Sequence, residues 1–313
     1  MLAMIVTLAI ASLAPARGGF VSFVDVLGTV SVFLLFFLHG ANLATRTMLE
    51  SLAHWRFHAL VLAGTFLVFP ALGLLLAPVS KTILDQSLYA GLLFLCCLPS
   101  TVQSSIAFTS IARGNVPAAV CTASASNLLG VFITPFLVGL LLARHSEISF
   151  ASLGPISATI VLPFLLGQIS RRWTSDFIAR HKSVLFFVDR GSVLVMVYAA
   201  FGKAVTSGIW NTVTPAQLAL VLVLCCVLLG CVVAYTLAAG RIVSLSAPDR
   251  VALMFCGSMK SLVTGVPMAI ILFPAATAGF IVLPLMIFHQ LQLLVFAMLS
   301  RSLGSRQSRV RTH

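Results

Sequence analysis

A series of apolar runs, each about as long as a membrane is thick, constrains the fold more than any other feature. Short polar stretches separate ten such runs, which lie at residues 2–15, 21–43, 58–78, 87–111, 115–143, 152–170, 186–206, 215–239, 251–273 and 275–299. About 20 apolar residues suffice for a helix to cross the hydrocarbon core. Only 8% of the residues are charged, against about a quarter in soluble domains. We therefore expect an all-α polytopic membrane protein with about ten transmembrane helices.

The first run is shorter than the others. It has the length of a signal-peptide core, but no basic region precedes it. We therefore expect a first span that is short or lacks its beginning, rather than a cleaved leader.

The basic residues indicate the orientation. With both termini in the cytoplasm, 14 of the 19 Lys and Arg residues lie in inner loops and the tail, and 4 lie in outer loops. This bias follows the positive-inside rule. Although the net charge is +12, the distribution argues against a nucleic-acid partner, because the charges form no single face. The sequence predicts an integral, multi-pass protein with both termini cytoplasmic.

The longest connection, residues 171–187, divides the ten spans into two sets of five. An odd number of spans in each half makes an internal repeat inverted in topology. We expect one repeat in residues 1–150, a second in 151–300, and a basic cytoplasmic tail at 301–313. Apolar and basic residues within 171–187 also predict an interfacial helix there.

The fourth span of each half contains polar residues together with Gly or Pro. In the first half it reads Leu-Pro-Ser-Thr-Val-Gln-Ser-Ser (Leu98–Ser105), and in the second it holds Lys260. A lysine in mid-membrane costs roughly 2.5–3.5 kcal/mol on insertion scales. Broken backbone at this depth is tolerated only inside protein or beside a watery cavity. We expect both helices to unwind, near 100–105 and near 257–261, and to cross there.

Paired breaks in inverted halves point to a binding site at the membrane midplane. Half-helix N-termini favour anions there, and C-terminal carbonyls favour cations. Three readings of Lys260 stay open: it tethers carbonyl ends, contacts substrate, or snorkels toward one face. The expected lining residues are Ser100, Thr101, Gln103, Ser104, Ser105, Lys260, Ser261 and Thr264.

Three stretches carry a resemblance to a known family. They are the block from Leu98 to Val116, Cys256-Gly-Ser-Met-Lys-Ser-Leu262, and Leu283-Pro-Leu-Met-Ile-Phe-His-Gln290. These resemble the bile acid:sodium symporter superfamily, and most of all its bacterial YfeH-like branch, which is related to the seventh member of the vertebrate bile acid transporter family. The resemblance covers essentially the whole chain.

The resemblance implies a core domain of spans 3–5 and 8–10 and a panel domain of spans 1, 2, 6 and 7. It implies a secondary transporter in a bacterial inner membrane that moves a small organic anion, such as a bile acid, steroid conjugate or carboxylate, by alternating access. His289 and Gln290 resemble a substrate-facing pair. Positions similar to the family's cation site are Thr65, Ser104, Ser105, Cys256, Ser258 and Lys260.

The chain departs from the family where sodium binds. Sodium-coupled members have Glu-x-Gly-x-Gln-Asn in span 9, and this chain has Cys256-Gly-Ser-Met-Lys-Ser261. All seven acidic residues lie in loops or near span ends. The sequence therefore argues against Na⁺ as the coupling ion and leaves H⁺ as the alternative. No cofactor or metal site is expected.

Other classes of protein fit the residues less well. An intramembrane serine hydrolase would need a Gly-x-Ser-x-Gly motif or paired carboxylates, which the sequence does not contain. A pore would need charged rings rather than paired breaks. The remaining alternative is a membrane-embedded scaffold or regulator that retains a transporter fold without coupled transport.

Overall fold

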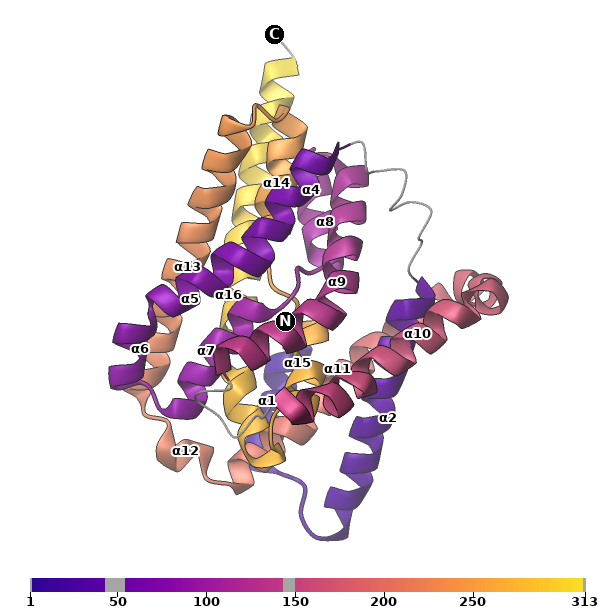
Figure 1. Ribbon diagram of the computed structural model, residues 1–313, viewed down its shortest axis with the longest axis vertical. Coiled ribbons are helices and arrows are strands. Elements are labelled where there is room, and N and C mark those ends of the chain that lie inside the picture. Colours follow the sequence, from indigo (N-terminus) through magenta and orange to yellow (C-terminus); the bar gives the residue numbers. More distant parts are fainter. Residues whose placement is uncertain (1, 43–53, 143–149, 312–313) are drawn as a thin grey trace.

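The computed structural model describes residues 2–42, 54–142 and 150–311. Every regular element among these residues is a helix (Figure 1). In chain order they are α1 (Leu2–Leu13), α2 (Gly19–Asn42), α4 (Trp55–Ala63), the π-helix η2 (Gly64–Val68), α5 (Phe69–Leu75), α6 (Ala77–Ile83), α7 (Gln86–Cys97), α8 (Gln103–Ile111), α9 (Val116–Leu142), α10 (Phe150–Arg180), α11 (Lys182–Thr206), α12 (Ile209–Thr212), α13 (Pro215–Ile242), α14 (Ala247–Ser258), α15 (Leu262–Leu272) and α16 (Ala275–Arg311).

Seven helical segments of the described chain are long and apolar enough to span a membrane. They are Gly19–Asn42, Trp55–Leu75, Val116–Leu142, Ser183–Thr206, Pro215–Ile242, Ala247–Leu272 and Ala275–Ser305. The other three expected spans coincide with α1, with α7 and α8 together, and with α10. The chain is thus an all-helical, multi-pass membrane protein.

The segment 171–187, expected to form an interfacial helix, is helical on both sides of His181, and its position at the membrane surface stays a prediction. Helix α10 continues to Arg180, and α11 begins at Lys182. The N–H of His181 still donates to the carbonyl of Phe177, so helical hydrogen bonding continues up to the junction. No Pro or Gly interrupts this stretch, so α10 continues as helix up to the junction with α11.

The C-terminal basic segment also continues a span. Helix α16 runs without a break from Ala275 to Arg311, although Pro284 lies within it. The segment expected as a tail at 301–313 is therefore helical as far as Arg311.

The helices pack in two sets. Helix α2 lies along α10 and α11, and α1 packs against α11. In the second set α7 packs on α16, α5 and α9, while α14 packs on α13, α8 and α4. Figure 1 shows α2 and α10 on the side of the molecule opposite α13 and α5. The sets meet where α11 contacts α15 and α16, and where α10 contacts α9 and α15.

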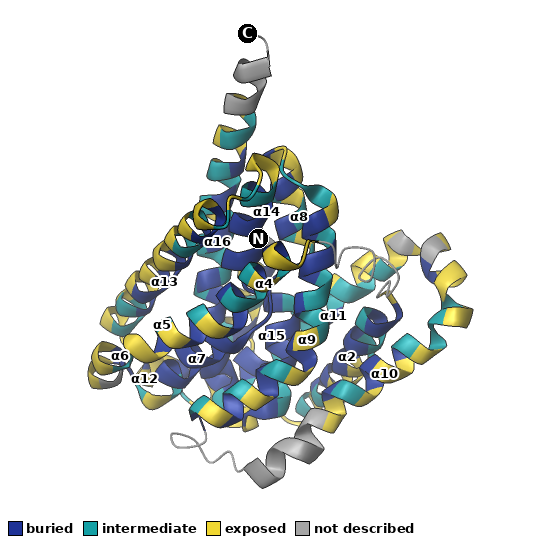
Figure 2. Cartoon of the chain, turned by 45° about the horizontal axis from the view of Figure 1, so that its top comes forward, coloured by how far each residue is buried: buried dark blue, intermediate teal, exposed yellow. Residues whose placement is uncertain are grey.

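The interrupted helices form the interior of the second set. All described residues from Leu88 to Cys97 in α7 and from Val251 to Ser258 in α14 are buried. Figure 2 shows α7, α14 and α15 as mostly buried, with exposed residues along α13 and α10. The polar, broken backbone is thereby kept away from lipid, as its unpaired groups require.

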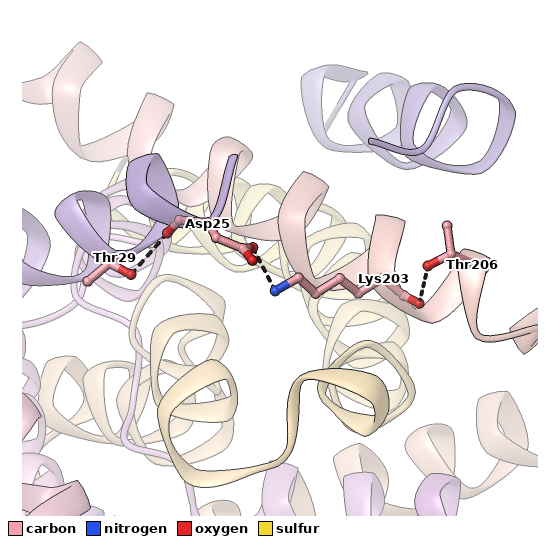
Figure 3. A network of polar contacts seen from close by, with 4 residues as sticks. All are labelled: Asp25, Thr29, Lys203 and Thr206. Atoms are coloured by element: carbon pink, nitrogen blue, oxygen red, sulfur yellow. Dashed lines mark hydrogen bonds and ion pairs between the residues drawn. The ribbon is translucent and has the colours of Figure 1, made fainter. Parts of the chain in front are cut away.

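An ion pair joins the N-terminal part of α2 to the C-terminal part of α11. Lys203 Nζ lies 2.6 Å from Asp25 Oδ1, and Thr29 and Thr206 donate to the carbonyls of Asp25 and Lys203 (Figure 3). Both charged side chains are about one-third to two-fifths exposed. A pair in that setting contributes at most about 1 kcal/mol, so it marks an end of the first helix set rather than holding it together.

Close backbone contact holds α2 against α10. A Cβ atom added at Gly40 would lie 2.0 Å from the carbonyl oxygen of Phe164, and one added at Gly167 would lie 2.0 Å from that of Phe37. The two glycines lie on opposite helices and face each other's backbone. Such small residues let membrane helices pack at short range.

We predict that Gly40→Ala or Gly167→Ala forces α2 and α10 apart. Overpacking typically costs about 1–3 kcal/mol, so the melting temperature of the purified protein in detergent should fall. Gly230→Ala is the matched control, because nothing lies within 4 Å of a Cβ added there. Equal melting temperatures for all three variants would contradict this account of the contact.

Candidate functional site

The two expected breaks are present and touch each other. Helical structure is interrupted over residues 98–102, between α7 and α8, and over 259–261, between α14 and α15. The N–H of Ser261 donates to the carbonyl of Pro99 at 2.9 Å. The two breaks therefore meet directly, through backbone groups that have no hydrogen-bond partner within their own helices.

Lys260 occupies the centre of this junction and is 0% exposed. Its Nζ donates to three backbone carbonyls, those of Thr65 at 2.9 Å, Cys96 at 2.9 Å and Leu98 at 2.6 Å. The Phe69 ring lies 4.1 Å from the same atom, in cation–π geometry. Three acceptors match the three hydrogens of an ammonium group.

The carbonyl of Thr65 is free because of Pro70. In η2 the N–H of Phe69 donates to Gly64, five residues back, instead of to Thr65. In the same π-type pattern Thr65 would accept from residue 70, but proline has no N–H. The local sequence therefore leaves one carbonyl oxygen without a helical donor, and the ammonium takes that place.

Pro99 releases the carbonyls at the end of α7. Because proline cannot continue the helix, the last carbonyls need partners from elsewhere. The partners come from α8, from α9 and from the break between α14 and α15. The pairs are Cys96 and Leu98 with Lys260 Nζ, Cys97 with Thr134 Oγ1, Pro99 with Ser261 N, Ser100 with Asn127 Nδ2, and Thr101 with Ser105 Oγ.

Gln292 of α16 satisfies the backbone of Lys260 itself. Its Oε1 accepts from the Lys260 N–H at 2.8 Å, and its Nε2 donates to the Lys260 carbonyl at 2.9 Å. Gln292 is buried. The amide therefore replaces a missing segment of helix with one donor and one acceptor.

The same amide determines which ring nitrogen of His289 carries the hydrogen. Since the Lys260 N–H can only donate, it must face Oε1 of Gln292, and this places Nε2 of Gln292 2.9 Å from His289 Nδ1. Nδ1 is then the acceptor, and the hydrogen of the neutral ring lies on its Nε2. His289 lines the cavity described next, so it offers that cavity an N–H donor.

A cavity of about 360 Å³ lies between the two helix sets. The first turns of α8 and α15 both face it, through Thr101 to Ser104 and through Ser261 to Thr264. Val102 gives α8 no side-chain cap, so the first N–H groups of that helix lack a partner from it. Helix N-termini of this kind attract anions.

Arg190 supplies a full positive charge to the cavity. It extends from α11, donates a hydrogen bond to Gln103 Oε1 on α8, and lies 5.2 Å from the Phe186 ring centroid. Asp189 and His39 also line the cavity. The remaining walls are largely apolar, with Phe36, Leu38, Leu128, Val131, Phe164, Ile178, Leu185 and Val263. A ligand with an anionic group and an apolar body fits this lining.

The structure separates the expected substrate-binding residues into two groups. Six line the cavity: Thr101, Gln103, Ser104, Ser261, Thr264 and His289. The other four, Ser100, Ser105, Lys260 and Gln290, are outside its lining. Ser100 and Ser105 are buried and donate to carbonyls, Ser100 to that of Cys256 at 2.6 Å. These hydroxyls support the broken backbone.

The expected cation-site positions surround the Lys260 junction only in part. Thr65 contributes its carbonyl, whereas its hydroxyl donates to Val61. Cys256 Sγ lies 3.9 Å from the carbonyl of Ala119. The Ser258 hydroxyl is buried without a hydrogen-bond partner among the described residues. The described part of the chain brings no three His, Cys, Asp or Glu side chains together for a metal ion.

Sequence reasoning missed Arg190, Asn127 and Gln292 as site residues. Asn127 donates to the carbonyl of Ser100 and accepts from Thr264 at 2.8 Å, so it links both breaks. Asn127 and Gln292 are amides in mid-span, and that position was a usable signal, because an unpaired amide in lipid is costly. Arg190 gave no such signal, since it lies at the loop end of its span.

These features define a class of protein, a polytopic membrane protein with paired broken helices beside a central cavity, the arrangement of secondary transporters. The chain belongs to the SBF-like CPA transporter family, whose model matches residues 1–305. It is 47% identical to the uncharacterized protein PA2026 of Pseudomonas aeruginosa over 98% of this chain and 92% of that protein. It is also 47% identical to the putative symporter YfeH of Escherichia coli, over 96% and 91%. Sodium/bile acid cotransporter 7 of Danio rerio is 29% identical, over 89% and 84%.

We predict that Gln292→Leu is strongly destabilising, because it leaves the buried N–H and carbonyl of Lys260 unpaired. Each such group costs about 1–3 kcal/mol, and a large fall in melting temperature in detergent should follow. The matched control is Gln290→Leu, since Gln290 Oε1 has no hydrogen-bond partner among the residues that the structure describes. Similar falls for the two variants would show that Gln292 does not act through Lys260.

Proposed function

We propose that this protein is a secondary active transporter of a small organic anion with an apolar body, such as a bile acid, a steroid conjugate or a carboxylate. The observation that carries the proposal is the cavity between the two helix sets, where Arg190 and the first turns of α8 and α15 meet apolar walls. The names of the relatives, a putative symporter and a sodium/bile acid cotransporter, agree with it.

The anionic group binds between Arg190, the N-terminus of α8 and the Nε2–H of His289. A carboxylate or sulfonate there replaces Gln103 as the hydrogen-bond acceptor of the guanidinium. A bond to an ionised acceptor is about twice as strong as a neutral one, so this exchange is favourable. The apolar body lies against Phe36, Phe164 and their neighbours.

The architecture behind this function is ten spans in two inverted halves, residues 1–150 and 151–300, in a bacterial inner membrane with both termini cytoplasmic. The first helix set acts as the panel domain and the second as the core domain. The cavity residues His39 and Arg190 lie at the ends of α2 and α11 that are opposite the Asp25–Lys203 pair. With the positive-inside orientation, these ends face the cytoplasm, and the structure corresponds to an inward-facing state.

Lys260 acts as a fixed cation in place of sodium. Its ammonium joins carbonyls of the third and fourth spans to the ninth, which is the work that a coordinated Na⁺ performs with oxygen ligands. A permanent tether leaves no empty cation site to fill during transport. Transport is therefore independent of Na⁺, and no cofactor takes part.

We predict that uptake of a labelled organic anion into proteoliposomes is the same in Na⁺, K⁺ or choline. Lys260→Met, which leaves three carbonyls unpaired, should abolish uptake and lower the melting temperature more than Lys260→Arg does. A tenfold gain in affinity specific to Na⁺, equal to about 1.4 kcal/mol of coupling, would rule out the fixed-cation role. Stimulation of Na⁺-free uptake by an imposed pH gradient would instead identify H⁺ as the coupling ion.

We predict that Arg190→Gln weakens anion binding about 10- to 150-fold, since a hydrogen bond to a charged group contributes about 1.5–3 kcal/mol. A thermal-shift screen of organic carboxylates, sulfates and sulfonates, each with an uncharged analogue, measures it. Arg180→Gln is the control, because Arg180 is exposed and outside the cavity lining. If no anion raises the melting temperature of the wild type and none is taken up, the scaffold alternative holds and the proposed function fails.

A further inference from the structure

A second cavity lies far from the proposed transport site, at the turn between α13 and α14. Its volume is about 390 Å³, and it is lined by Arg241 and Arg250 with the apolar side chains of Leu237, Val251, Met254 and Leu303. Figure 1 shows the end of α13, the start of α14 and the C-terminal part of α16 together. With the proposed orientation, this is the cytoplasmic end of the core helices.

The turn between α13 and α14 brings Arg241 and Arg250 to the same cavity. Gly240 allows Arg250 to lie across α13, since a Cβ atom there would be 3.1 Å from Arg250 Cγ. The turn itself is rigid: Ser244 has a φ of 55°, and the N–H of Leu245 donates to the carbonyl of Gly240. Arg241 follows Gly240 directly, so the two arginines reach the cavity from adjoining parts of α13 and α14.

The nearest carboxylate does not neutralise these arginines by contact. Asp249 Oδ1 accepts from Asn115 Nδ2 at 2.7 Å, and its Oδ2 accepts from Ser246 Oγ at 2.6 Å. Among the described residues, no ion pair or hydrogen bond is formed by the guanidinium group of Arg241 or Arg250. Two guanidinium groups that have no side-chain partner in the described part of the chain favour a ligand that carries a phosphate, whose oxygens match their paired N–H groups.

The surroundings of the cavity favour a phospholipid over a free phosphate ion. Ile242, next to Arg241, is 81% exposed, and Cys231, Ala234 and Ala238 are exposed along the adjoining stretch of α13. Figure 2 shows α13 at the edge of the molecule with exposed residues along it. An acyl chain would lie along this face while its phosphate reached the arginines. Basic pockets between membrane helices on the cytoplasmic side bind anionic head groups in this way.

We propose that the cavity between α13, α14 and α16 binds the head-group phosphate of an anionic phospholipid from the inner leaflet. Arg241 and Arg250 contact the phosphate, and Leu237 and Met254 contact the glycerol end of the acyl chains. The site does not depend on the transported solute, so it stands even where the proposed anion transport fails.

The test compares the full-length wild type with the Arg241→Gln/Arg250→Gln double variant in detergent. Dioleoyl phosphatidylglycerol, dioleoyl phosphatidylcholine and inorganic phosphate are added separately, and melting temperature and lipid retention in native mass spectrometry are recorded. The control is Arg56→Gln/Arg180→Gln, which removes two exposed arginines elsewhere. Each surface arginine contributes about 1 kcal/mol toward an anionic lipid, so the double variant should bind phosphatidylglycerol about 30-fold more weakly.

Each outcome either supports or overturns the lipid site. Retention and stabilisation of the wild type and the control by phosphatidylglycerol, with loss in the double variant, support the site. Equal binding of phosphatidylcholine, equal loss in the control, or equal protection by inorganic phosphate alone would overturn it. If the double variant does not fold, the single variants Arg241→Gln and Arg250→Gln give the same comparison, and unchanged affinity in both overturns the site as well.

Discussion

The contact between the Lys260 ammonium and three backbone carbonyls is the interaction on which the rest of the structure depends. A charge buried in a membrane protein is expensive unless it is fully paired, and a free carbonyl at that depth is expensive as well. Here the ammonium and the carbonyls pair with each other, so neither the buried charge nor the free carbonyls remain unpaired. The carbonyls come from η2 and from the C-terminal end of α7, and the ammonium from the break between α14 and α15, so a single group fixes the relative positions of three segments.

The electrostatics of the broken helices divide the centre of the protein into two regions. C-terminal carbonyls of α7 face the ammonium, whereas the first turns of α8 and α15 face the cavity. The same interruption therefore produces a cation-binding side and an anion-binding side. Gln292 connects them, because one amide holds the Lys260 backbone and also His289 in the cavity wall. A displacement of the Lys260 backbone would therefore be transmitted to the cavity wall through the side chain of Gln292.

Some hydroxyls that the sequence predicted to contact a ligand instead bind the protein backbone. Ser100 and Ser105 lie in the polar stretch of the fourth span, yet both are buried and bonded to backbone carbonyls. A broken helix needs donors for its free carbonyls as much as a ligand needs contacts. Polar residues near such a break therefore serve two purposes, which only their neighbours in space distinguish.

The sequence by itself determined that this is an all-helical, multi-pass membrane protein, and it located both helix breaks, because apolar length, Pro, Gly and a mid-membrane lysine act locally along the chain. It also indicated half-helix N-termini facing an anion. Tertiary structure alone decided which carbonyls Lys260 binds, since Thr65 is 195 residues away in the chain. Only the packing of α11 against α15 and α16 brought Arg190 to the cavity. Contacts between distant segments depend on how whole helices pack, and the periodicity or composition of a single segment does not predict that packing.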